Sequence, residues 1–222
     1  MMIALIENAL IQRLQQGLGQ LVREVGSYSG ELDDDLPEAI RRFPSVWVTF
    51  GGIVDSKPRS TSRQQYRVQG QYVVMVGERS VRSHLAGRQG GPGAGEVGSY
   101  ALVRAVRRLL TEQDLGLDIS PLNPGKVRTL FNTRLADQAF SVFACEFACS
   151  WLEQALPLGG WPVPPSPDED SGHHHPDRIF ALASGRTNQP DPPLLGIGLH
   201  YHLVPDDGVA DTRDILRRKP WK

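Results

Sequence analysis

The stretch FSVFACEFACSWL, residues 140–152, decides the fold. Large apolar side chains occupy every second position from Phe143 to Trp151, and this alternation places them on one face of a β-strand. The opposite face is thinner and includes Glu146 and Ser150. We therefore expect the longest strand of the protein here, with a core face made of Phe143, Cys145, Phe147, Cys149 and Trp151.

The two cysteines of the chain, Cys145 and Cys149, lie on that face. At roughly 3.3 Å per residue they are about 13 Å apart, too far for a disulfide. We predict buried free thiols, as in cytoplasmic proteins. Neither has a local partner that would lower its pKa, and no G-x-S-x-G motif occurs. The sequence therefore predicts no enzyme active site.

Three further segments are predicted to be strands. Residues 45–50 (SVWVTF) alternate up to Gly51 and Gly52, where a bend or bulge is expected. Residues 66–76 (YRVQGQYVVMV) form a longer alternating run, and residues 127–131 (VRTLF) a short one. The polar segment 55–65 joins the first two strands as a hairpin-like loop.

Two amphipathic helices are predicted beside these strands. Apolar residues recur at steps of three and four over residues 2–24, and Gly26 is expected to end this helix. A second helix begins at Ser99, with Arg104, Arg107 and Arg108 facing out. The pattern predicts an α+β fold, in which both helices pack on one side of a mixed, largely antiparallel sheet of four to five strands.

Composition changes at Gln154. Prolines, glycines and charges dominate residues 154–193, which cannot bury enough apolar area to offset their ordering entropy. Residues 194–204 (LLGIGLHYHLV) again predict a strand. We expect a core of residues 1–153 and a C-terminal arm of residues 154–222, which packs on its own core or on a neighbouring subunit.

The charge balance is close to neutral, with a net charge of −1 over 222 residues. No basic field would therefore attract nucleic acid. The N-terminal apolar run contains Glu7 and lacks a basic segment, so it does not predict a signal peptide. No run approaches the roughly 18 apolar residues of a membrane span.

Three polar motifs have simpler explanations than ligand binding. Gly93, Gly95 and Gly98 spell G-x-G-x-x-G, but residues 79–89 are polar and no strand runs directly into the first glycine, so we predict a flexible loop. The triplet His173, His174 and His175 lacks the spacing of zinc sites and predicts a solvated linker, with adventitious nickel or zinc binding as the alternative. His200 and His202 share one strand face, which is commonly exposed to solvent. No metal or cofactor is predicted.

An acidic turn, residues 33–35 (DDD), precedes Pro37 and a short helix that ends with Arg41 and Arg42. Negative charge at the start of a helix and positive charge at its end both stabilise the helix dipole. We therefore interpret these aspartates as a helix cap and not as a carboxylate site.

Four whole segments carry a family likeness: residues 30–52 (GELDDDLPEAIRRFPSVWVTFGG), 113–123 (QDLGLDISPLN), 127–151 (VRTLFNTRLADQAFSVFACEFACSW) and 205–215 (PDDGVADTRDI). They resemble the Mu-like phage tail protein family, whose members are taken to be tail terminators. The chain departs from the family pattern in an insert around residues 161–175.

The resemblance implies a structural virion protein at the head-proximal end of the tail, made in the host cytoplasm. Such a protein forms a ring, usually a hexamer, that caps the tail tube, stops its polymerisation and joins the head-side connector. Its partners would be further copies, the tube protein, the connector or neck protein and, in contractile tails, the sheath. DNA would pass through the lumen without specific binding. The alternatives are a neck or head-completion protein and, less favoured, a nucleotide-binding enzyme that uses the loop of residues 93–98.

Candidate contact residues lie in the polar loops 56–65 and 79–98 and near the end of the arm. Arginine suits bidentate contacts with acidic groups on a partner. The predicted partner-binding residues are Arg59, Arg63, Arg79, Arg82, Arg88, Tyr201, Arg217 and Arg218.

Overall fold

The computed structural model describes residues 2–34, 36–80, 98–135, 138–165, 175–188, 196–201 and 212–217. The chain divides into two compact units, Met1–Pro157 and Leu158–Lys222. In the described residues, the first unit contains a five-stranded sheet with its helices, and the second contains a two-stranded sheet and one short helix.

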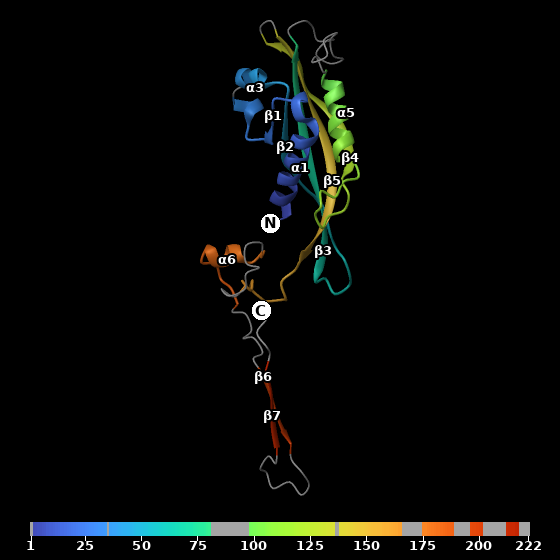
Figure 1. Cartoon of the computed structure of the whole chain (residues 1–222). Helices are drawn as coiled ribbons and strands as arrows, with labels where there is room; N and C mark the ends of the chain where they lie inside the picture. The colour runs from blue at the N-terminus through green and yellow to red at the C-terminus, as the bar shows by residue number, and fades with distance from the viewer. Residues whose placement is uncertain are drawn as a thin grey trace. The chain divides into compact units, whose positions relative to one another are not determined.

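The sheet of the first unit has the strand order β1-β2-β3-β5-β4 among the residues described (Figure 1). β1 runs parallel to β2, and all other neighbours are antiparallel. The predicted α+β fold with a mixed, largely antiparallel sheet is confirmed. The strands are β1 (Glu24–Ser27), β2 (Ser45–Pro58), β3 (Gln65–Ser80), β4 (Asn123–Leu135) and β5 (Gln138–Gln154).

The strands extend beyond their apolar runs, because backbone pairing continues where the side chains turn polar. β2 reaches Pro58, which pairs with Tyr66 of β3, so the loop between them is residues 59–64 and not 55–65. The predicted bulge is confirmed: the register shifts between Phe50 and Gly52, and Gly52 has a φ of 113°. A left-handed backbone of this kind favours glycine.

The first helix is shorter than predicted. α1 spans Met2–Leu18 and is followed by a 3₁₀ turn, Gly19–Leu21. Gly19 has a φ of 49°, a conformation in which helices commonly end. Gly26, which the sequence predicts as the end of the helix, lies instead in β1, opposite Trp47 of β2.

The two predicted helices pack on the same face of the sheet, as expected. Leu10 of α1 and Val106 of α5 (Ser99–Leu110) are fully buried with Phe147 of β5 in one apolar cluster. Arg13 Nε of α1 donates a hydrogen bond to the Leu109 carbonyl of α5 at 2.6 Å. Phe143, Cys145, Phe147, Cys149 and Trp151 are all buried, which confirms the predicted core face of β5.

The other face of the sheet is also covered at one end. α2 (Glu31–Asp34) and α3 (Leu36–Arg42) contribute to a second cluster around Phe43 and Trp47. Val142 of β5, on the face predicted to be thinner, is buried here. In Figure 1, α3 and α5 lie on opposite sides of the sheet.

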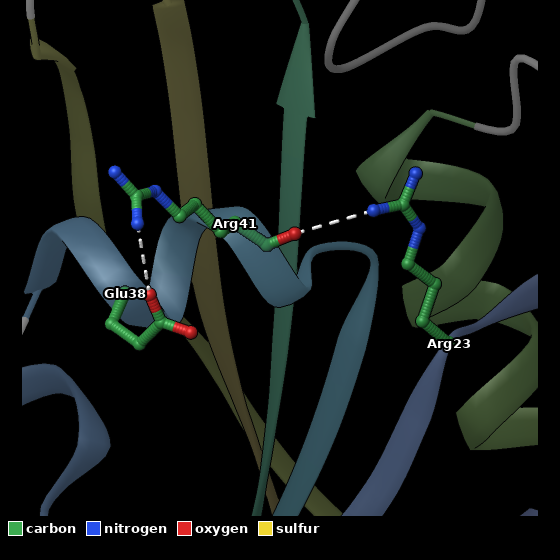
Figure 2. Close-up of polar contacts among 3 residues, drawn as sticks. All are labelled: Arg23, Glu38 and Arg41. Carbon is green, nitrogen blue, oxygen red and sulfur yellow. Dashed lines mark hydrogen bonds and ion pairs between the residues drawn. The ribbon is translucent and has the colours of Figure 1, made fainter.

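The acidic run 33–35 is largely helical, since Asp33 and Asp34 belong to α2. Asp35 lies outside the described residues, so its predicted capping role stays a prediction. Arg41 and Arg42 occupy the last turn of α3, as expected. Arg41 pairs with Glu38 at 3.3 Å, and Arg23 Nη1 donates to the Arg41 carbonyl at 3.2 Å (Figure 2).

The second unit has its own backbone contacts. β6 (Gly196–Tyr201), which lies within the strand expected over residues 194–204, pairs with β7 (Thr212–Arg217). Near α6 (Arg178–Leu182), the Arg186 guanidinium lies 4.3 Å from the Trp161 ring centre. In the described part of this unit, the following large apolar side chains are exposed: Leu158, Trp161, Val163, Ile179, Phe180, Leu182, Leu199 and Tyr201.

Candidate interaction surfaces

The tip of the β2–β3 hairpin presents two of the predicted contact residues to solvent. Arg59 donates its backbone N–H to the Gln65 carbonyl and its Nη1 to Gln65 Oε1, both at 2.8 Å. The backbone N–H of Arg63 donates to the Ser60 carbonyl at 3.1 Å and closes the turn. Both arginines are exposed, so the tip offers positive charge on an ordered turn.

Arg79 lies at the other end of β3 and is half-buried. Because β3 is 16 residues long, the two predicted contact loops start roughly 50 Å apart at 3.3 Å per residue. Arg82 and Arg88 lie outside the described residues. The structure therefore separates the hairpin tip from the β3–α5 connection and does not bring their arginines together.

The predicted contact residues of the arm are also separated from one another. Tyr201 ends β6 opposite Thr212, and Arg217 ends β7 opposite Gly196, so the two lie at opposite ends of the two-stranded sheet. Tyr201 is exposed. Arg218 lies outside the described residues.

A hollow of about 720 Å³ on the outer side of α5 is a surface that the sequence analysis did not count as a site. Arg104 and Arg108 are exposed there, as predicted, whereas Arg107 is half-buried and donates to the Gly125 carbonyl at 3.2 Å. In the sequence, the arginines on the outer side of this amphipathic helix already indicated a basic surface. The residues that line the hollow are Tyr100, Val103, Arg104, Arg107, Arg108 and Thr111.

Glu78 is a second residue that the sequence analysis missed. Val74, Val76 and Glu78 occupy alternate positions of β3 and share its core face. This alternation in the sequence indicates that Glu78 is buried. Its Oε2 atom is buried and makes no hydrogen bond within the described part of the chain. Burial raises the pKa of Glu78 to about 7, opposed by a hydrogen bond from the Arg79 backbone.

The two cysteines are poor candidates for nucleophiles. Both are free and buried, as predicted. Burial raises the pKa of each thiol, Cys145 and Cys149, to about 11. At neutral pH both therefore stay protonated, while the thiolate is the reactive form.

Within the described ranges, no three His, Cys, Asp or Glu residues gather as a metal site would require. His175 Nδ1 accepts the Asp177 backbone N–H at 3.2 Å, whereas His173, His174 and His202 lie outside those ranges. Gly93 and Gly95 of the glycine motif lie outside as well, and Gly98 directly precedes α5. None of the described helices is long and apolar enough to cross a membrane.

Comparison with known families adds the decisive observation. The family model for Bacteriophage Mu, Gp37 matches residues 2–152. The chain belongs to this family. The match covers the sheet and helices of the first unit almost to the end of β5. No curated protein matches the chain. Membership of the Gp37 family identifies a Mu-like phage protein and favours a structural role over an enzymatic one.

Proposed function

We propose that this Gp37-family protein is a tail terminator. In this role a ring of copies, six in the usual case, caps the last ring of the tail tube, stops its polymerisation and joins the tail to the head-side connector. The family match over residues 2–152 carries the proposal. The role needs a rigid sheet with two distinct contact ends and requires no catalytic chemistry.

The two ends of β3 supply suitable contact regions. The hairpin tip with Arg59 and Arg63 lies at one end, and the connection that follows Ser80 begins at the other. Two partners can thus bind opposite ends of one subunit without competing. Exposed arginines favour acidic groups on the tube protein or the connector.

The second unit completes the ring by packing on a neighbouring subunit. A two-stranded sheet is at best marginally stable alone in water. Leu182 is 74% exposed and Ile179 61% exposed, so α6 presents apolar surface that burial would stabilise. A neighbouring copy is always available in a ring.

Near-neutral charge suits a channel for DNA. Each phosphate that Lys or Arg neutralises adds affinity and would retain the passing duplex. The chain carries 24 basic and 25 acidic residues, which gives no net attraction for DNA. DNA accordingly passes through the lumen without specific binding.

Deletion of the gene tests the role. A growing tube presents the same surface after each added ring, so only a different protein removes the template for the next ring. Deletion should give tails of abnormal length beside DNA-filled heads that fail to join them, and the wild-type gene supplied in trans should restore normal particles. Normal-length tails that still join heads would rule the role out and favour a neck protein.

A further inference from the structure

The described sheet of the first unit ends in two edge strands, β1 and β4. Neither has a neighbouring strand on its outer side among the described residues, so each leaves backbone donors and acceptors there. None of the four residues of β1 is buried. On β4, Val127 is 40% exposed and Leu130 39% exposed. Exposed apolar side chains on an unpaired edge favour pairing with a strand of another chain.

The two edge strands lie level with each other across the sheet. Successive pairings connect Ser27 to Val127: Ser27–Val48, Val48–Val74, Val74–Cys145 and Cys145–Val127. The same count connects Val25 to Thr129. The register of β4 shifts on both sides of residues 127–129, so these residues are a regular part of the strand. This regular part of one edge is therefore level with residues 25–27 of the other edge.

β1 and β4 also run in opposite directions. β1 is parallel to β2, and each of the three further steps across the sheet is antiparallel. When two copies lie side by side with the same face forward, β4 of one copy therefore meets β1 of the next as an antiparallel pair. Ser27 then lies opposite Val127, and Val25 lies opposite Thr129. The Val25 carbonyl accepts Gln15 Nε2 at 3.0 Å within one copy and can exchange this exposed bond for a backbone N–H of β4.

Apolar side chains suit this pairing on one face of the sheet. Val25 aligns with Val46, and Val127 aligns with Cys145, and both partners belong to the apolar cluster beneath α1 and α5. Val25 and Val127 therefore lie on the same face, where they are diagonal neighbours across the contact. Bringing them together removes apolar surface from water.

The other face provides space and complementary charge. Arg128 lies opposite Gly26 of the next copy, where an added side-chain carbon would meet no atom within 4 Å in the single chain. Arg128 pairs with Glu146 of its own copy at 2.9 Å, and its side chain stays 59% exposed. Its diagonal neighbour is Glu24 of the next copy, which pairs with Arg42 at 3.6 Å and whose side chain is 37% exposed. The Arg128 guanidinium can therefore contact a carboxylate on each side of the contact.

We propose that β4 of one copy pairs with β1 of the next, so that the sheets of neighbouring copies join into one. Because the contact uses two different edges, each copy can use both at once. Such a head-to-tail contact closes into a ring or continues as a filament. The inference deepens the proposed terminator ring and rests on it for closure.

Cysteine cross-linking tests the pairing with full-length protein. Val25→Cys and Thr129→Cys in one chain place thiols opposite each other across the contact, within the reach of a disulfide. Mild oxidation should link this double variant into covalent multiples of 24.5 kDa on a denaturing gel. The wild type should stay unlinked, because both of its cysteines are buried. An equimolar mixture of the two single variants should give linked dimers, whereas either single variant alone should give none.

Val25→Cys with Arg128→Cys is the matched control, because adjacent residues of a strand point to opposite faces. This pair should give little linked product. Val127→Lys with Leu130→Lys should weaken self-association in sedimentation velocity, since lysine on an edge strand opposes pairing. Circular dichroism melts establish that each variant is folded.

Three results would overturn the inference. They are a wild type that stays monomeric at all concentrations, linked dimers of one single variant, which indicate a two-fold contact, and a double variant that links no better than the control pair. If rings form without this link, only this interface is wrong. The gene-deletion phenotype tests the terminator role separately.

Discussion

The sheet of the first unit and the two-stranded sheet of the second use the same backbone pairing but differ in burial. In the first, Tyr72 and Phe147 are fully buried beneath α1 and α5. In the second, Leu199 and Tyr201 of β6 stay exposed. Pairing needs only a neighbouring strand, whereas burial needs a second layer of structure. The comparison teaches that the first unit supplies its own second layer, whereas the described residues of the second unit leave their large apolar side chains exposed.

The family match follows the same division. It ends at residue 152, two residues before the end of β5, and leaves the second unit outside. The part of the chain that resembles Gp37 proteins is therefore the part that buries its own core. The exposed apolar residues of the second unit belong to the part that the family model does not cover.

The largest expected effect comes from emptying the core of the first unit. Phe147→Ala removes a fully buried ring and should lower the free energy of unfolding by about 3–5 kcal/mol. Phe180→Ala, at a ring that is 43% exposed in the second unit, is the matched control and should change it by about 0.5 kcal/mol or less in the unassembled protein. Urea unfolding measures both, and equal losses would break the comparison between the units.

The next effect depends on pH and concerns Glu78. Its pKa rises from an ordinary value of 4.5 to about 7 in the folded protein, so the folded state binds more protons than the unfolded state between these values. The free energy of unfolding should therefore fall as pH rises from about 4.5 to 7 and stay lower above that window.

Glu78→Gln should remove this fall and stabilise the protein at pH 8 by about 1–3 kcal/mol, since no charge is then buried. Thermal melts from pH 4 to pH 8 measure it. Glu112→Gln, at an exposed turn, controls for the loss of one carboxylate. A wild-type profile that rises between pH 5 and 7 in parallel with Glu78→Gln would contradict the assignment.

A smaller loss is expected where the second face of the sheet is closely packed. A methyl group at Gly77 would clash with the ring of Phe43, which Trp47 and Phe140 hold in place. Gly77→Ala should therefore cost about 1–3 kcal/mol. Gly26→Ala is the control, because its added carbon would meet no atom within 4 Å. Equal stability of the two variants would show that the Phe43 ring does not pack tightly against Gly77.

The smallest effect on folding should come from removing the second unit altogether. A chain that ends at Pro157 keeps both apolar clusters of the first unit, so its thermal transition should match that of the monomeric full-length protein. Residues 158–222 alone should show no cooperative transition. Loss of the transition in the shortened chain would mean that the arm completes its own core and would overturn its proposed packing on a neighbour.

Periodicity in the sequence determined which residues lie on the face of the sheet that α1 and α5 cover. Alternation identified Val74 of β3 and Phe147 of β5, and three- and four-residue steps identified Leu10 of α1. These predictions held because side-chain direction repeats every two residues in a strand and about every 3.6 in a helix, whatever the partner. The same alternation placed Cys145 and Cys149 on the buried face, and burial raises the pKa of both thiols.

Contacts between distant segments decided the rest. The parallel pairing of β1 and the burial of Val142 depend on what packs beside each segment, which local periodicity does not contain. The predicted contact arginines were chosen from loop composition, and only the length of β3 placed their loops at opposite ends of the sheet.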